Sequence, residues 1–252
     1  MNSRLLKIEL KSAFRKLWIL YAGALVCALP IWLFNITFPV LFTLLVFGAV
    51  AFCAAFLLIG MLILWQELIH CLFDARSSLI RTLPVSLKTL FSTSCISALI
   101  VTAVNLLIVL AVLILVFMPS GLDFTILPEE VRSVLMWLIP GGYLQLVFIW
   151  LCGVFGLVTS KGNASSRILS AAGRGILIYF ILEIVMVLIA FGFLIASQTL
   201  SLDMVVGEAD ISFESMKTLL IFIFGEYLIV DALLYGYSFK KISRGIDIDG
   251  QF

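Results

Sequence analysis

Six stretches of the 252-residue chain contain few charged residues and are long enough to cross a lipid bilayer. A spanning helix needs about 20 mostly apolar residues. Backbone polar groups in lipid must be satisfied within the spanning structure, and continuous apolar runs without strict alternation indicate helices over barrel strands. The sequence therefore predicts an all-α polytopic membrane protein in which one domain, 1–252, has six transmembrane helices: 17–36, 39–68, 89–118, 134–158, 175–197 and 218–238.

Lysine and arginine are distributed unevenly between the loops on the two sides of these stretches. Fourteen of the sixteen lie in the N-terminal segment, in 69–88, in 159–174 or in the C-terminal tail, and only Arg132 and Lys217 lie elsewhere. Short cytoplasmic loops retain lysine and arginine, so we predict that both termini are cytoplasmic. The acidic residues of the opposite, outer loops agree with this orientation: Asp123, Glu129, Glu130, Asp203, Glu208, Asp210 and Glu214.

Residues 2–16 are predicted to form an amphipathic helix in the membrane interface. Their apolar side chains recur every three or four positions, and Lys7, Lys11 and Arg15 line another face. Cations on such a helix lie near anionic headgroups. The alternative is an ordinary positively charged flank of the first span.

The segment 69–88 combines apolar and charged residues, so it is neither a solvated loop nor a span. Proline disfavours helix at the residue before it, so we expect a short amphipathic helix along the inner membrane face, a break at Leu83–Pro84 and then the third span. Such a surface suits docking to a cytoplasmic protein. The next inner segment, 159–174, is predicted to be a small polar loop.

Two glycine patterns in the fourth span make local predictions. Pro140, Gly141 and Gly142 predict a kink or a hinge near its outer end. Gly153 and Gly156 predict close packing against a neighbouring helix.

Several classes of enzyme are excluded by missing motifs. The chain has no Gly-x-x-x-x-Gly-Lys-Ser/Thr phosphate loop and no His-Glu-x-x-His pair, and His70 is its only histidine. None of the five cysteines lies in a predicted outer loop, so a disulfide framework is not expected. We predict no catalytic residue, no metal, no cofactor and no nucleic-acid partner.

Three acidic residues lie away from the ends of predicted spans: Glu183, Glu226 and Asp231. A charge at the centre of a bilayer costs about 2.5–3.5 kcal/mol on insertion scales, so such residues normally face a bundle interior or a wet cavity. Glu183 and Glu226 are candidates for a translocation path, contacting a polar or cationic substrate or carrying protons. The alternative is hydrogen-bonded packing near Asn105, Gln145 or Tyr179.

Sequence spacing shows which ionisable side chains can share one face of a helix. Glu226 and Asp231 are five positions apart, which places them about 140° apart around a helix. Glu67 and His70 are three positions apart and can meet on one helix face, where an ion pair at the inner interface is expected.

The basic N-terminal stretch, the segment 69–88 and above all the run Arg-Thr-Leu-Pro-Val-Ser-Leu-Lys at 81–88 carry a family resemblance. The chain resembles a six-helix permease subunit of the type-2 ATP-binding-cassette (ABC) exporters, especially small bacterial permeases without a large outer domain. The resemblance implies the plasma (inner) membrane of a bacterium and contact with membrane lipids.

The resemblance also implies roles for individual segments. Residues 69–83 would be the coupling helix that docks on a separate cytoplasmic ATPase subunit, and 2–16 would be the elbow helix. A second permease subunit, identical or different, would complete the transport path. The residues expected to contact the ATPase are Leu72, Phe73, Asp74, Arg76 and Leu79.

Two alternatives to an exporter subunit remain open at this point. One is a stand-alone secondary transporter that uses Glu183 or Glu226 for proton coupling. The other is a membrane scaffold or immunity protein that transports nothing.

Overall fold

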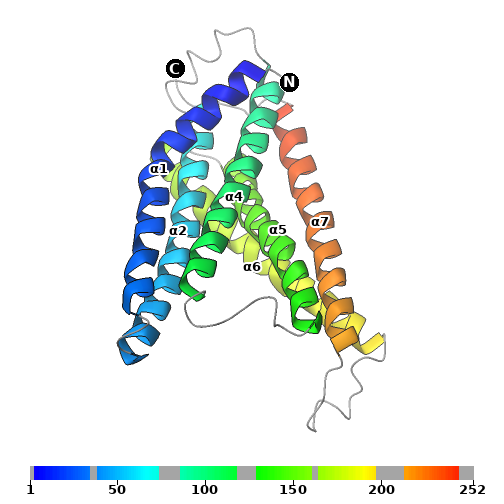
Figure 1. The fold of residues 1–252 in the computed structure, drawn as a ribbon. Coiled ribbons are helices and arrows are strands. Elements are labelled where there is room, and N and C mark those ends of the chain that lie inside the picture. Colours follow the sequence, from blue (N-terminus) through cyan, green and yellow to red (C-terminus); the bar gives the residue numbers. More distant parts are fainter. Residues whose placement is uncertain are drawn as a thin grey trace. The chain divides into compact units, whose positions relative to one another are not determined.

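A computed structural model describes residues 3–34, 39–73, 86–117, 129–160, 164–196 and 213–243, which are α-helical except at Ser86 and Ser160. The predicted all-α fold is confirmed for these residues, which contain no strand. The helices, labelled in Figure 1, are α1 (Ser3–Phe34), α2 (Pro39–Phe73), α4 (Leu87–Phe117), α5 (Glu129–Thr159), α6 (Ala164–Ala196) and α7 (Phe213–Ser243).

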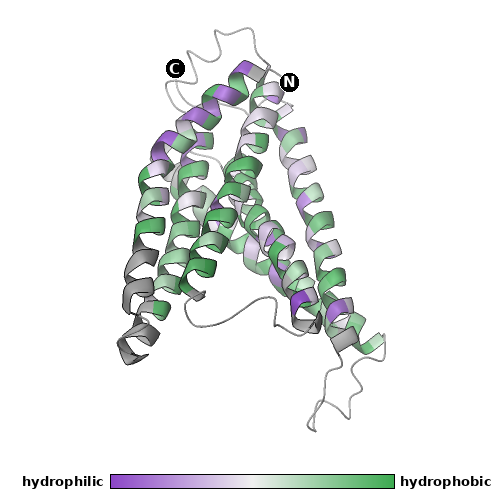
Figure 2. Ribbon diagram, viewed as in Figure 1, coloured by the Kyte–Doolittle hydropathy of each residue, from purple (hydrophilic) through white to green (hydrophobic). Residues whose placement is uncertain are grey.

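Among the described residues, five helices contain stretches long and apolar enough to cross a membrane. These stretches confirm a multi-pass helical membrane protein. The first predicted span, 17–36, continues beyond the described residues of α1, and the number of six spans stays a prediction. Figure 2 shows hydrophobic residues along the helices and hydrophilic residues gathered on the N-terminal part of α1. The five stretches are Val46–Ile69, Leu87–Val116, Arg132–Thr159, Leu169–Ala196 and Met216–Ser243.

The helices belong to two compact units. Unit 1 is Met1–Ile126 and contains α1, α2 and α4, whereas unit 2 is Leu127–Phe252 and contains α5, α6 and α7. In unit 1 each helix packs against the other two. The interior between them is filled by small and apolar side chains: Ala24, Ala49, Cys53, Phe56, Val109, Val112 and Val116.

Helix α1 does not stop between the predicted interfacial helix 2–16 and the first span. It is continuous from Ser3 to Phe34, and no proline or glycine occurs around the predicted junction at Lys16–Leu17 to interrupt it. Figure 1 shows that its N-terminal part runs obliquely to the remainder of the helix, near the end of α2 and the start of α4. The bend occurs within one helix rather than at a break.

The predicted inner segments are also more helical than expected. Helix α2 continues through 69–73, and the rest of the predicted inner helix and the break at Leu83–Pro84 fall on residues that the structure does not describe. Helix α6 begins at Ala164, inside the predicted loop 159–174. The polarity of this segment suggested a loop, but alanine and arginine have high helix propensity, so the helix can begin before its apolar stretch. Residues 74–85 lie outside the described part of the chain.

Helix α4 begins with a side-chain cap at Ser86. The Ser86 hydroxyl accepts a hydrogen bond from the Thr89 backbone N–H at 3.2 Å, and the Ser86 carbonyl accepts one from Leu90 N–H at 3.1 Å. A serine N-cap satisfies one of the N–H groups that a helix leaves unpaired at its start. The beginning of the third predicted span is therefore set by local chemistry.

Unit 2 is organised around α5, which packs extensively against both α6 and α7. Helix α5 continues through Pro140 without a break, so the predicted hinge at Pro140–Gly142 is not an interruption of the helix. The predicted close packing of Gly153 and Gly156 is confirmed, since both face Gly175 on α6. This crossing lets the backbones of α5 and α6 approach each other directly.

Candidate functional site

A network of polar side chains joins the three helices of unit 2, and we call it the polar network: Gln145 on α5, Tyr179 and Glu183 on α6, and Tyr227 on α7. Gln145 Nε2 donates to the Tyr179 hydroxyl at 3.4 Å. The Tyr227 hydroxyl lies 3.3 Å from Glu183 Oε1 and also contacts Gln145 Oε1. Because Tyr227 has one hydroxyl proton, it donates to one of these acceptors at a time.

The aromatic rings of the network are held by Phe148 on α5. The Phe148 ring is fully buried, and its centroid lies 5.5 Å from the Tyr179 ring and 5.6 Å from the Tyr227 ring. Tilted ring pairs at this separation are favourable. Phe148 therefore packs between the two tyrosines whose hydroxyls carry the network.

Asp231 lies one helical turn after Tyr227 on α7 and is only 8% exposed. Within the described chain, neither of its carboxylate oxygens has a hydrogen-bond partner, and Glu183 Oε2 also has none. Asp231 and Glu183 both act electrostatically on Tyr227 and on Cys152. The two carboxylates thus share the same neighbours, and Asp231 belongs to the surroundings of the polar network.

Glu226 lies on a different side of α7. It directly precedes Tyr227, so its side chain is turned about 100° around the helix from the polar network. Its Oε1 is buried and has no hydrogen-bond partner within the described residues. The two predicted path residues are therefore not brought together: Glu183 is in the network and Glu226 is outside it.

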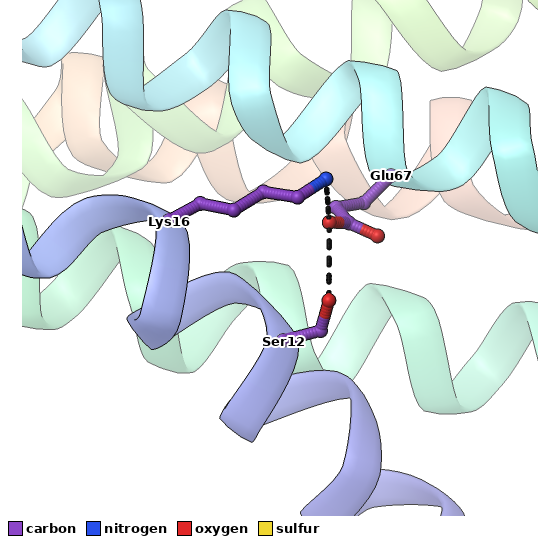
Figure 3. Close-up of polar contacts among 3 residues, drawn as sticks. All are labelled: Ser12, Lys16 and Glu67. Carbon is purple, nitrogen blue, oxygen red and sulfur yellow. Dashed lines mark hydrogen bonds and ion pairs between the residues drawn. The ribbon is translucent and has the colours of Figure 1, made fainter.

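In unit 1 the N-terminal part of α1 is tied to α2. Lys16 forms an ion pair with Glu67, and the Ser12 hydroxyl donates to Glu67 Oε1 at 3.3 Å (Figure 3). Lys16 and Glu67 are partly exposed, so the ion pair contributes little energy on its own. The ion pair instead helps to fix the position of α1 on α2, because Ser12 and Lys16, one turn apart on α1, both contact the same carboxylate on α2.

The same part of α1 is tied to α4 by Glu9. Its Oε1 accepts a hydrogen bond from the Ser94 hydroxyl at 3.0 Å. Burial raises the pKa of Glu9 to about 7, the Ser94 hydrogen bond opposes that shift, and the Glu67 charge adds to it. We call Glu9, Ser12, Lys16, Glu67 and Ser94 the α1 anchor.

A third polar contact lies deeper in unit 1. The Tyr21 hydroxyl donates to Asn105 Oδ1 at 2.7 Å, and Asn105 is 1% exposed. A methyl group added to Gly60 would lie 2.5 Å from Asn105 Nδ2, so Gly60 leaves room for the amide. Asn105 is thus a packing residue bonded to Tyr21.

The residues expected to contact an ATPase cannot be placed by side chain. Leu72 and Phe73 are in the last turn of α2, and their side chains lie outside the described part of the structure. Asp74, Arg76 and Leu79 lie outside the described residues altogether. The His70 side chain is likewise outside it, so the expected ion pair between Glu67 and His70 stays a prediction. Glu67 forms an ion pair with Lys16.

Sequence reasoning identified part of the site. Glu183 stood out as an acid within a span, and Gln145 and Tyr179 were named as possible neighbours. Tyr227 and the α1 anchor were missed, because a tyrosine in an apolar helix is unremarkable and the anchor joins residues 55 and 85 positions apart. The one sequence signal for the anchor was Glu9, an acidic residue in the otherwise basic segment 2–16.

No group of three or more histidine, cysteine, aspartate or glutamate side chains capable of holding a metal ion occurs among the described residues. Comparison of the chain with models of protein families, with curated proteins and with solved structures gives no match.

Proposed function

We propose that this chain is the membrane-spanning permease subunit of a type-2 ABC exporter and couples ATP hydrolysis by a separate ATPase subunit to substrate translocation. The proposal rests on the run at 81–88 and on the multi-pass helical architecture. Its partners would be a cytoplasmic ATPase and a second permease subunit in the plasma membrane of a bacterium.

The observation that carries the proposal is the position of the α1 anchor. Helix α2 ends at Phe73 and α4 begins at Leu87, so these two helices border the segment 74–85. The anchor ties α1 to the last turns of α2 through Glu67 and to the first turns of α4 through Ser94. A force applied to the bordered segment would therefore reach three helices of unit 1 together.

In this mechanism the chain performs no chemistry. Docking of the segment 69–83 on the ATPase would transmit closure of the ATPase to α2, α4 and α1. Apolar side chains would supply most of the docking energy, because interface energy concentrates in a few buried anchors and rim charges contribute little. Leu72, Phe73 and Leu79 are the proposed anchors, and Asp74 and Arg76 are the proposed rim.

The test is co-purification of this chain with a candidate cytoplasmic ABC ATPase subunit, followed by transport in proteoliposomes. Phe73→Ala should weaken ATPase association or uncouple ATP hydrolysis from transport while leaving membrane insertion unchanged. Arg76→Ala is the matched control and should have a smaller effect. Normal association and transport with both Phe73 and Leu79 replaced by alanine would refute the assignment.

Glu183 and Glu226 are the proposed residues of the translocation path. Glu183 is supported by the polar network and Glu226 by its buried Oε1 without a partner. Glu183→Gln and Glu226→Gln should leave insertion and assembly intact and change transport. Unchanged transport in both variants would remove them from the path.

A second candidate function is favoured by the buried carboxylate of Asp231. An unpartnered acid inside a span is typical of proton relays, and a proton-coupled secondary transporter would need one. Transport that requires a proton gradient and proceeds without any ATPase would favour this candidate over the exporter.

A further inference from the structure

The carboxylates of Glu183 and Asp231 have unsatisfied binding capacity. Asp231 is more than nine-tenths buried with two unpartnered oxygens, and Glu183 uses only Oε1 within the described residues. Burying negative charge in a medium of low polarity is unfavourable unless a positive group compensates it. Among the described residues no positively charged side chain bonds to Glu183 Oε2 or to either Asp231 oxygen, so the site has three acceptor oxygens to offer.

The other side chains around these carboxylates indicate which kind of cation fits. The Phe148 ring contacts the rings of Tyr179 and Tyr227, and the Tyr227 hydroxyl lies 3.3 Å from Glu183 Oε1. Ring faces attract cations, and the attraction grows when water is excluded. The Gln145 carbonyl and the tyrosine hydroxyls add a few polar groups that orient a ligand, as in typical small-molecule sites.

The composition of the site favours an organic cation over a metal ion. The described residues provide no group of three acidic, histidine or cysteine ligands. Apolar side chains flank Glu183 on α6, where Phe180 is 57% and Ile184 58% exposed. Tyr179 and Glu183 are themselves partly exposed on this helix, so the site is open toward the apolar surface of α6.

We propose that Glu183 and Asp231, together with the aromatic rings of Phe148, Tyr179 and Tyr227, bind a lipophilic organic monocation such as a quaternary ammonium compound. That this cation is the exported substrate rests on the proposed function. Its binding to the chain does not, because all five side chains belong to unit 2 and none belongs to the segment proposed to contact the ATPase.

The test measures binding of benzyltrimethylammonium to the purified full-length chain in detergent by equilibrium dialysis. The control ligand is neopentylbenzene, in which carbon replaces the charged nitrogen and the shape is kept. Saturable binding of the cation and none of the neutral isostere is expected. Equal binding of both compounds would show partition into apolar surface and would overturn the proposal.

Variants assign the binding to these residues. Glu183→Gln and Asp231→Asn should each weaken binding at least about tenfold, since a hydrogen bond or ion pair to a buried charge is among the stronger contacts. Tyr227→Phe removes a hydroxyl from the network, whereas Tyr237→Phe removes one from an exposed position on the same helix and should leave binding unchanged. Unaltered binding in both carboxylate variants would overturn the proposal.

If either carboxylate variant fails to fold, competition on the wild-type chain decides. Tetrapropylammonium should displace benzyltrimethylammonium, and sodium chloride at matched ionic strength should not. Displacement by sodium alone would indicate an inorganic cation site and would refute the organic one. ATPase co-purification is measured separately. Cation binding by a chain that associates with no ATPase would support this site and refute the exporter. Association with an ATPase but no cation binding would support the exporter and refute this site.

Discussion

Gly156 on α5 and Gly175 on α6 lie so close that a methyl group added to Gly156 would stand 2.6 Å from the Gly175 backbone nitrogen. The same methyl group would also collide with the Ala171 carbonyl. Backbone atoms cannot rotate away as the end of a flexible side chain can. The contact therefore defines how α5 and α6 pack in unit 2.

Gly156→Ala should force α5 and α6 apart and destabilise the protein. Overpacking of this kind costs about 1–3 kcal/mol, and a collision with backbone belongs at the upper end. Thermal unfolding in detergent would measure the loss. Gly173→Ala is the matched control, because nothing lies within 4 Å of a methyl group there, and its stability should equal or exceed that of the wild type. Equal stability of both variants would show that the crossing is not tight.

The pH dependence of stability should carry a contribution from Glu9. Its pKa of about 7 in the folded chain lies above its ordinary value of 4.5, so the folded state favours the protonated acid. The penalty for burying the charge is absent below pH 4.5 and complete above pH 7. Lowering the pH from 8 to 5 should therefore raise stability, by at most about 3 kcal/mol and by less where solvent screens the charge.

Thermal unfolding at pH 5 and pH 8 would measure this contribution. The groups that act on Glu9 are Ser94 on α4 and Glu67 on α2. Glu9→Gln keeps the shape of the side chain and should flatten the difference between the two pH values. A wild-type chain whose stability changes with pH no more than that of Glu9→Gln would contradict the assignment.

The Tyr21–Asn105 hydrogen bond should contribute to the packing of α1 on α4. Tyr21→Phe leaves the buried Asn105 Oδ1 without its donor, which costs about 1–3 kcal/mol. Asn105→Ala removes the acceptor and opens space beside Gly60. A double-mutant cycle in chemical or thermal unfolding isolates the interaction. Strictly additive effects of the two changes would show that the hydroxyl and the amide do not interact.

The orientation predicted from the charges can be tested by labelling. Cysteines placed at Asp123 and Asp203 should react with membrane-impermeant reagents added to intact cells, whereas cysteines at Ser78 and Ser165 should react only after permeabilisation. The cause is the retention of basic segments on the cytoplasmic side. Labelling at Ser78 in intact cells would reverse the orientation.

The helices themselves were predictable because each is long and apolar, and a helix in lipid must satisfy its own backbone. Their ends were not. Phe73 and Ala164 extend α2 and α6 into segments that polarity assigned to other structures, because helix formation continues wherever no residue breaks it. The uninterrupted passage of α5 through Pro140 is a further case in which a local breaker was outweighed by the surrounding helix.

The candidate site divides in the same way. An acidic residue within an apolar stretch can be recognised without knowing its neighbours in space, so Glu183, Glu226 and Asp231 could be identified from the sequence. Their partners were visible only when the helices were assembled, because Tyr227 reaches Glu183 across 44 positions of sequence. Glu183 and Glu226 were equivalent candidates in the sequence, but the rotation of α7 about its axis turns Tyr227 toward Glu183 and leaves Glu226 outside the polar network.

The sequence alone determined that this protein is helical and belongs in a membrane, since apolar length and the demand for internal backbone hydrogen bonding admit no soluble alternative. It also determined where close helix packing was expected, as at Gly156. Tertiary structure decided which polar groups meet: Lys16 with Glu67, Glu9 with Ser94, and Glu183 with Tyr227. These pairs depend on the rotation and depth of whole helices, and those follow from packing among distant residues rather than from any local pattern.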